Sequence, residues 1–133
     1  MDVVYSSPSL EMTFEVEKSL MVLDWKAQTA HWTEADFKAE NLHIVEVIAL
    51  HRPQYMLSLS QDFAYSINPE NQVWIAENVF TAHKRNGVKK LALILSSDFI
   101  AQLSIEQSTE EAPVLPSAMF DNREEAEKWL FAD

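Results

Sequence analysis

The sequence predicts a single α/β domain in which a mixed β-sheet packs against about four helices. Segments with strand-like patterns alternate with segments of helical periodicity along most of the chain. The run LALIL at 91–95 is apolar throughout, as in a parallel strand covered on both faces. The chain has 133 residues, of which 47% are hydrophobic, which is enough for one core. We therefore expect one domain over residues 1–133, with the later strands paired in parallel through right-handed crossovers.

The first predicted element is a β-hairpin over residues 12–25. Met12, Phe14 and Val16 alternate with polar neighbours, which is the pattern of a strand with one buried face. A polar turn then leads into the nearly all-apolar run at 20–23. This arrangement predicts two antiparallel strands near the N-terminus.

The first long helix is expected between Thr33 and Arg52. Thr33 is a favoured N-cap residue, and Pro53 disfavours helical backbone at the residue before it. Its inward face is predicted by the residues that recur at helical spacing, namely Phe37, Asn41, Ile44, Val45 and Ile48.

A short strand at 55–59 is expected to lead, through a loop, into the second helix. Asn68-Pro69-Glu70 combines an N-cap residue, a proline suited to the first helical position and an acid that suits the helix dipole. Gly87, the only glycine, follows Asn86 and predicts the helix end. Helical spacing assigns Val73, Ala76 and Phe80 to the inner stripe, so Trp74 is expected to point away from it.

After the central strand at 88–95, a third helix is expected from the capping pair Ser97-Asp98, with Phe99, Ile100 and Leu103 facing inward. The acidic stretch at 108–117, which holds two prolines, is predicted to be a flexible loop.

The chain should close with a short edge strand at 118–120 and a last helix. The residues at 121–124 are similar to a capping box, and Ala126, Trp129 and Leu130 are expected to face inward from that helix.

The order of these elements resembles the SpoIIAA-like fold shared by STAS domains and CRAL-TRIO-type lipid carriers, and in particular the small bacterial STAS-like proteins. Three phrases carry the resemblance: NQVWIAENV, GVKKLALILSSDFIAQLS and the terminal MFDNREEAEKWL, which is the most specific. Membership of this family would imply a binding or regulatory module more than an enzyme.

Composition narrows the function further. The 21 acidic and 10 basic residues give a net charge of -11, which makes nucleic acid and anionic membrane surfaces poor partners. The absence of cysteine excludes disulfides, thiol nucleophiles and zinc sites built on cysteine. We see neither a leader peptide nor a membrane span and expect a cytoplasmic protein. A single glycine excludes glycine-rich phosphate loops and a glycine-flanked nucleophile elbow, so we expect no catalytic residues, no cofactor and no enzymatic activity.

The resemblance to STAS domains implies a serine that can be phosphorylated at the start of the helix after the central strand. Here the equivalent phrase contains Pro69, which has no hydroxyl, and Glu70, which already carries a negative charge. We therefore predict that the family's phosphorylation switch is absent, with Ser66 the nearest remaining serine.

Two histidine-containing patterns could suggest other chemistry. Glu40-x-x-His43-x-x-Glu46 places three metal-ligand types on one helix face, but we expect that face to be solvated and to bind no metal. His83 shares the second helix with the predicted inner stripe and is expected to be an ordinary core or boundary histidine with its hydrogen bonds satisfied.

The remaining candidate site is the loop and helix start at 60–74, where open α/β sheets place ligands. We expect Phe63, Tyr65 and Trp74 to form an exposed aromatic rim, although a loop of this length also commonly buries its own aromatics. The full candidate set is Ser60, Asp62, Phe63, Tyr65, Ser66, Asn68 and Trp74.

Two functions follow from this site. The first is recognition of a protein partner, with self-association into a homodimer as one form of it. The alternative is a small carrier or sensor of an apolar or lipidic ligand, which an apolar cavity beneath the helix at 97–107 would favour.

Overall fold

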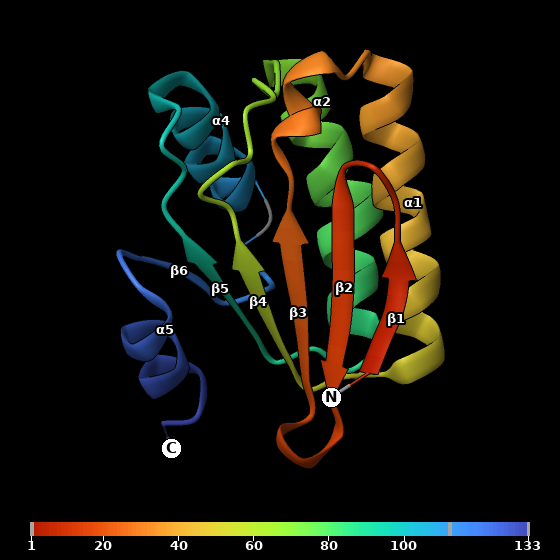
Figure 1. The fold of residues 1–133 in the computed structure, drawn as a ribbon, viewed down its shortest axis with the longest axis vertical. Coiled ribbons are helices and arrows are strands. Elements are labelled where there is room, and N and C mark those ends of the chain that lie inside the picture. Colours follow the sequence, from red (N-terminus) through yellow and green to blue (C-terminus); the bar gives the residue numbers. More distant parts are fainter. Residues whose placement is uncertain (1, 112, 133) are drawn as a thin grey trace.

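The computed structural model describes residues 2–111 and 113–132 and has the predicted α/β architecture (Figure 1). Six strands form one sheet, and the N-terminal part of the sheet is antiparallel. The strands are β1 (Asp2–Ser6), β2 (Leu10–Glu15), β3 (Leu20–Trp25), β4 (Tyr55–Leu59), β5 (Lys90–Ile94) and β6 (Ser117–Phe120). The helices are α1 (Glu34–His51), α2 (Pro69–Ile75), the π-helical turn η3 (Ala76–Phe80), α3 (Thr81–Arg85), α4 (Phe99–Glu110) and α5 (Arg123–Leu130), with 3₁₀ turns at Val16–Lys18 and Ala27–His31.

The strands lie in the sheet in the order in which they occur along the chain. Strands β1 to β3 are antiparallel neighbours, whereas β3 to β6 pair in parallel. The predicted hairpin is confirmed as β2 and β3, in which Met12 pairs with Leu23. Strand β1 was not predicted; it is a short edge strand, and its Val3 is 57% exposed, so it lacks the buried periodicity that marks a strand.

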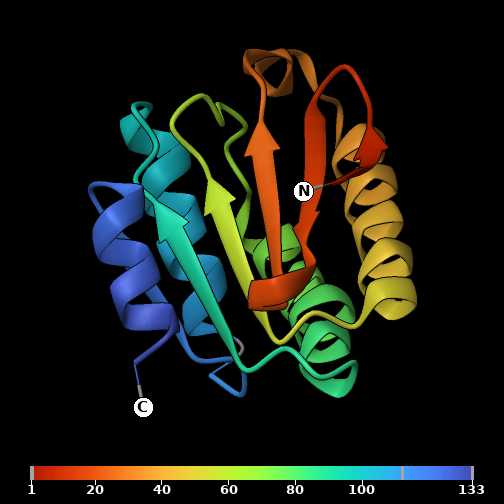
Figure 2. The same cartoon turned by 60° about the horizontal axis from the view of Figure 1, so that its bottom comes forward.

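Helices cover both faces of the sheet, but unequally (Figure 2). Leu91 and Leu93 of β5 belong to the large core shared with α1, α2, η3 and α4. Their neighbours Ala92 and Ile94 point to the opposite face, where they pack with residues of α5. The continuous apolar run in β5 is therefore explained by burial on both faces, as predicted.

Local sequence signals set the helix ends. The Thr33 side chain accepts a hydrogen bond from the Asp36 amide, and the Asp36 carboxylate accepts one from the Thr33 amide, which completes a capping box. The Asn68 side chain caps α2. Gly87 follows α3 with a φ of 102°, a left-handed conformation that glycine adopts without steric cost.

The predicted inner stripe of the second helix is wrong at Val73, which is 39% exposed, while Trp74 is half-buried against the large core. The reason is partly the π-helical turn. In η3 the Thr81 amide bonds to the Ala76 carbonyl, five residues back, so residues along this turn rotate less than the regular 100°. Asn78 and Thr81 donate side-chain hydrogen bonds to carbonyls four residues back, which helps to satisfy the backbone there.

The prediction for α4 is also wrong, because Phe99, Ile100 and Leu103 face outward. Its inward face consists of small or polar residues and one isoleucine: Ala101, Ser104, Ile105 and Ser108. Ser104 faces inward because its hydroxyl accepts a hydrogen bond from the Ile67 amide and thereby binds the loop before α2. The inward face of α4 therefore combines this hydrogen bond to the loop with the burial of Ala101 and Ile105 in the large core.

Helix α4 also continues to Glu110, into the stretch predicted to be a loop. Of that stretch, residue 112 lies outside the described residues, and Leu115 is buried in the large core. The edge strand and last helix follow as predicted, with Asn122 as the cap of α5. Ala126 and Leu130 are fully buried, but Trp129 is only half-buried.

Candidate ligand-binding site

A cavity of about 70 Å³ lies between the sheet and the helices of the large core. Every residue that lines it is buried. Most lining residues are apolar, and none is charged: Leu23, Trp25, Phe37, Asn41, Ile44, Met56, Ser58, Ser60, Phe63, Ile67, Ile75, Val79, Phe80, His83, Leu91, Leu93, Ile105 and Ser108.

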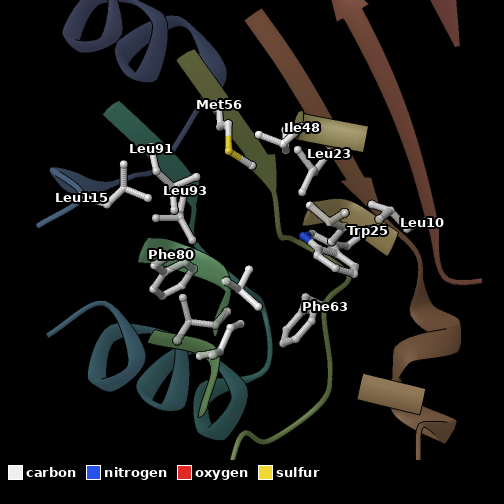
Figure 3. Packing of buried hydrophobic residues seen from close by; sticks show 14 of the residues in the cluster. Leu10, Leu23, Trp25, Ile48, Met56, Phe63, Phe80, Leu91, Leu93 and Leu115 are labelled. Atoms are coloured by element: carbon white, nitrogen blue, oxygen red, sulfur yellow. The ribbon is translucent and has the colours of Figure 1, made fainter. Parts of the chain in front are cut away.

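The sheet and the helices contribute opposite walls. Figure 3 shows Met56 and Leu93, from neighbouring parallel strands, on the side of the sheet that faces Phe80. Phe63, from the loop after β4, packs edge-on against Trp25 with ring centroids 5.2 Å apart. Trp25 ends β3, and Ser60 follows β4, so the cavity reaches the carboxyl ends of two parallel strands, where open α/β sheets place ligands.

The loop at 60–68 covers this end of the cavity and is held on both sides. Its Ala64 amide donates to the Thr29 hydroxyl at 2.9 Å, before α1. Its Phe63 carbonyl accepts a hydrogen bond from Ser96 at 2.6 Å, before α4. These bonds pair partly buried backbone groups and tie the loop to the segments on both sides of it, so that the loop closes this end of the cavity.

The predicted exposed aromatic rim is wrong, because the loop folds its aromatics inward. Phe63 is only 5% exposed, and Tyr65 and Trp74 are half-buried. Tyr65 stacks on the Phe37 ring at 5.1 Å, and Trp74 lies 5.9 Å from the same ring. Burial, followed by the charge of Glu34, raises the pKa of Tyr65. These rings form a packed layer beside the cavity.

Of the other predicted site residues, one lies in the cavity wall and the rest lie on the protein surface. Ser60 is buried and lines the cavity, where its Oγ lies 2.6 Å from that of Ser58. Asp62, Ser66 and Asn68 are exposed. Of the predicted set, the structure therefore brings only Ser60 and Phe63 into the cavity wall.

Sequence reasoning missed the chemical interest of His83. The histidine is buried in α3, as expected, but its Nδ1 atom has no hydrogen-bond partner among the described residues. Burial alone lowers the pKa of His83 to about 4, so the imidazole is neutral at physiological pH. No sequence motif marks it; the only available signal was its position four residues after Val79, which is also buried.

The Glu40, His43 and Glu46 face is not fully solvated, which corrects the expectation for Glu40. Glu40 is 7% exposed and accepts hydrogen bonds from the Tyr5 hydroxyl at 2.5 Å and the Ser7 hydroxyl at 2.9 Å. Burial and the adjacent Glu40 carboxylate raise the pKa of Tyr5 to about 12. Glu40 thus anchors the N-terminal strand to α1. No cluster of three or more metal-ligating side chains occurs in the described parts of the chain.

Comparison with protein-family models, curated proteins and solved structures finds no match to this chain. Within residues 2–111 and 113–132, no helix has the length and apolarity needed to cross a bilayer.

Proposed function

We propose that the protein is a non-catalytic STAS-like module of SpoIIAA-like fold that binds a small apolar molecule in its internal cavity. The observation that carries the proposal is the cavity of about 70 Å³ with its mainly apolar wall. Ligand sites are typically apolar hollows with a few polar groups, which describes this lining well.

The arrangement of the sheet supports the STAS-like part of the proposal. Consecutive parallel strands follow an N-terminal antiparallel hairpin, and the terminal helix packs on the face opposite the other helices. From the hairpin onward, the order of strands and helices agrees with the order on which the resemblance rests. The resemblance to CRAL-TRIO-type carriers, in turn, is consistent with an apolar ligand.

The volume limits the size of the ligand. An engineered protein cavity of about 150 Å³ accommodates benzene or xenon. A cavity of about 70 Å³ is roughly half that size, so it suits xenon or a molecule of about three or four heavy atoms. A longer lipid chain would need Phe63 or another part of the wall to move.

Xenon is the appropriate first probe, because it is apolar and makes no directional bonds. We expect xenon to shift the methyl resonances of lining residues such as Ile105 and Leu93, or to appear as density between them in a pressurised crystal. Val79→Leu should weaken xenon binding, since the added methylene occupies cavity volume. Val73→Leu, the same change at an exposed position of the same helix, should leave binding unchanged.

The proposal fails if xenon neither shifts lining methyl groups nor occupies the cavity. It also fails if Val79→Leu and Val73→Leu bind xenon equally well, because the bound atom would then lie elsewhere.

Self-association into a homodimer is a second candidate function, supported by the outer face of α4. Phe99 is 77% exposed and Ile100 is 57% exposed, with Leu95 and Leu103 also exposed nearby. Exposed apolar patches mark interaction surfaces. In a chain with a net charge of -11, the segment at 95–105 contains a single charged residue, Asp98, so this segment adds little to the electrostatic repulsion between copies.

Light scattering over a concentration series tests the homodimer. Ile100→Glu should shift the protein to monomer, whereas Leu50→Glu, an equally non-conservative change at an exposed site on α1, should not. A wild-type protein that stays monomeric at all concentrations would exclude this candidate.

A further inference from the structure

We infer that the imidazole of His83 is the polar anchor of the cavity, so that the ligand is a small neutral molecule with an apolar body and one hydroxyl, such as a short-chain alcohol. This inference rests on the proposed function and specifies the ligand of the same cavity.

A π-helical turn precedes His83 and brings Ile75 and Phe80, which flank it around the helix axis, to the same wall of the cavity. Residues five apart lie about 140° from each other around a regular α-helix. In a π-helical turn they lie nearly one above the other, which brings Phe80 close to the side of Ile75. Ile75 and Phe80 both line the cavity, and His83, which lies between them around the helix axis and four residues after Val79, joins them in the wall. Such turns occur frequently at functional sites.

His83 differs from the other polar side chains of the lining in its hydrogen bonding. The Trp25 indole donates to Ser58 at 3.0 Å, and Ser108 donates to the Ser104 carbonyl at 2.8 Å. The Asn41 amide donates to the Phe37 carbonyl at 2.9 Å. These groups are already bonded within the protein.

The Nδ1 atom of His83, by contrast, is buried and has no partner in the described residues. A buried polar atom without a partner costs free energy, and an imidazole in a cavity wall can recover part of that cost by bonding to an occupant.

The chemistry of the wall selects the occupant. The lining carries no charged side chain, so an ionised ligand would lose its hydration without gaining a counter-charge. Burial lowers the pKa of His83 and keeps the ring neutral, with one nitrogen that donates and one that accepts. A hydroxyl can serve either nitrogen, because it both donates and accepts. The volume leaves room for about three or four heavy atoms, which corresponds to an alcohol such as 1-propanol.

The test compares 1-propanol with xenon as probes of the same cavity. Binding is measured by titration of lining methyl resonances in the wild type, in His83→Leu and in His83→Gln. Leu and Gln have similar volumes, but only Gln can hydrogen-bond. We expect the 1-propanol affinity to fall roughly tenfold in His83→Leu and to be largely retained in His83→Gln, whereas xenon should bind all three proteins alike.

A direct readout accompanies the titration. The ¹⁵N resonances of the His83 ring should move when 1-propanol binds but not when xenon binds, which a merely structural histidine would not show.

The outcomes separate the two proposals. If xenon binds but 1-propanol binds His83→Leu as well as it binds the wild type, the anchor inference is wrong and the cavity proposal stands. If an ordered water already satisfies His83 and 1-propanol does not displace it, the inference is likewise wrong. If neither probe enters the cavity, the proposed function itself fails.

Discussion

Acidification should destabilise the protein through His83, because the folded state disfavours the charged imidazole. In the unfolded chain the ring titrates near its ordinary pKa of 6.5, whereas burial lowers the pKa to about 4 in the folded protein. The unfolded state therefore binds a proton first as the pH falls. Stability is at its full value above pH 6.5 and declines as the pH falls from 6.5 towards 4.

The size of the effect follows from the two pKa values. Each pH unit between them is equivalent to about 1.4 kcal/mol, so the full loss is roughly 3 kcal/mol. Between pH 7 and pH 5 we expect a loss of about 2 kcal/mol. Glu127 affects stability only below pH 5. Burial alone would raise its pKa, but hydrogen bonds from Arg123 and Lys18 lower it. The ionised Glu127 therefore stabilises the folded state above its ordinary pKa of 4.5, and this contribution is lost as the pH falls further.

The assay is urea unfolding followed by tryptophan fluorescence at pH 7, 6 and 5. His83→Leu should lose about 2 kcal/mol less than the wild type across this range, because a neutral side chain does not titrate. It should also be at least as stable as the wild type at pH 5, because it removes a buried polar group without a partner. His31→Leu, which changes an exposed histidine, should lose as much unfolding free energy between pH 7 and pH 5 as the wild type, because His83 still titrates. Equal losses in the wild type and in His83→Leu would refute the reasoning.

Three further predictions concern the surroundings of the cavity and the N-terminal strand. Trp74→Ala should cost about 2 kcal/mol in urea unfolding, less than the roughly 3–5 kcal/mol of a fully buried tryptophan; a negligible loss would mean that its half-buried packing is not formed in solution. Phosphopeptide mapping of protein from its native cells should find no stoichiometric phosphate on Ser66, since Glu70 already provides the negative charge near the helix start. Stoichiometric phosphate on Ser66 would refute the prediction that the phosphorylation switch is absent. Elemental analysis of untagged protein should find no bound metal, because the Glu40 oxygens accept hydrogen bonds from Tyr5 and from a serine; an equimolar metal that Glu40→Gln removes would contradict this.

The helix boundaries illustrate what can be inferred from local chemistry. Thr33, Asn68 and Asp98 each accept a hydrogen bond from an amide in the first turn of the helix that they cap. Gly87 has the left-handed backbone that ends a helix. These interactions span three or four residues, so their outcome depends little on the remainder of the chain.

Helix faces were harder to infer, because they depend on what lies opposite. Phe99 and Ile100 are more apolar than Ser104, yet Ser104 faces inward to bond the Ile67 amide, 37 residues earlier in the sequence. Val73 and Trp74 were misplaced for a related reason, since periodicity arguments assume a regular helix and the turn that follows them is π-helical.

The sequence by itself determined the α/β class, the hairpin, the helix starts, the helix end at Gly87 and the burial of β5 on both faces, because each depends on residues that are close in the chain or on a simple apolar pattern. Only the tertiary structure decided where the cavity lies and that His83 lines it without a partner for Nδ1. The cavity wall combines residues from three strands, the helices and a loop, and its volume depends on how closely these elements pack. Whether a buried nitrogen finds a partner depends likewise on groups distant in sequence, which no periodicity or motif encodes.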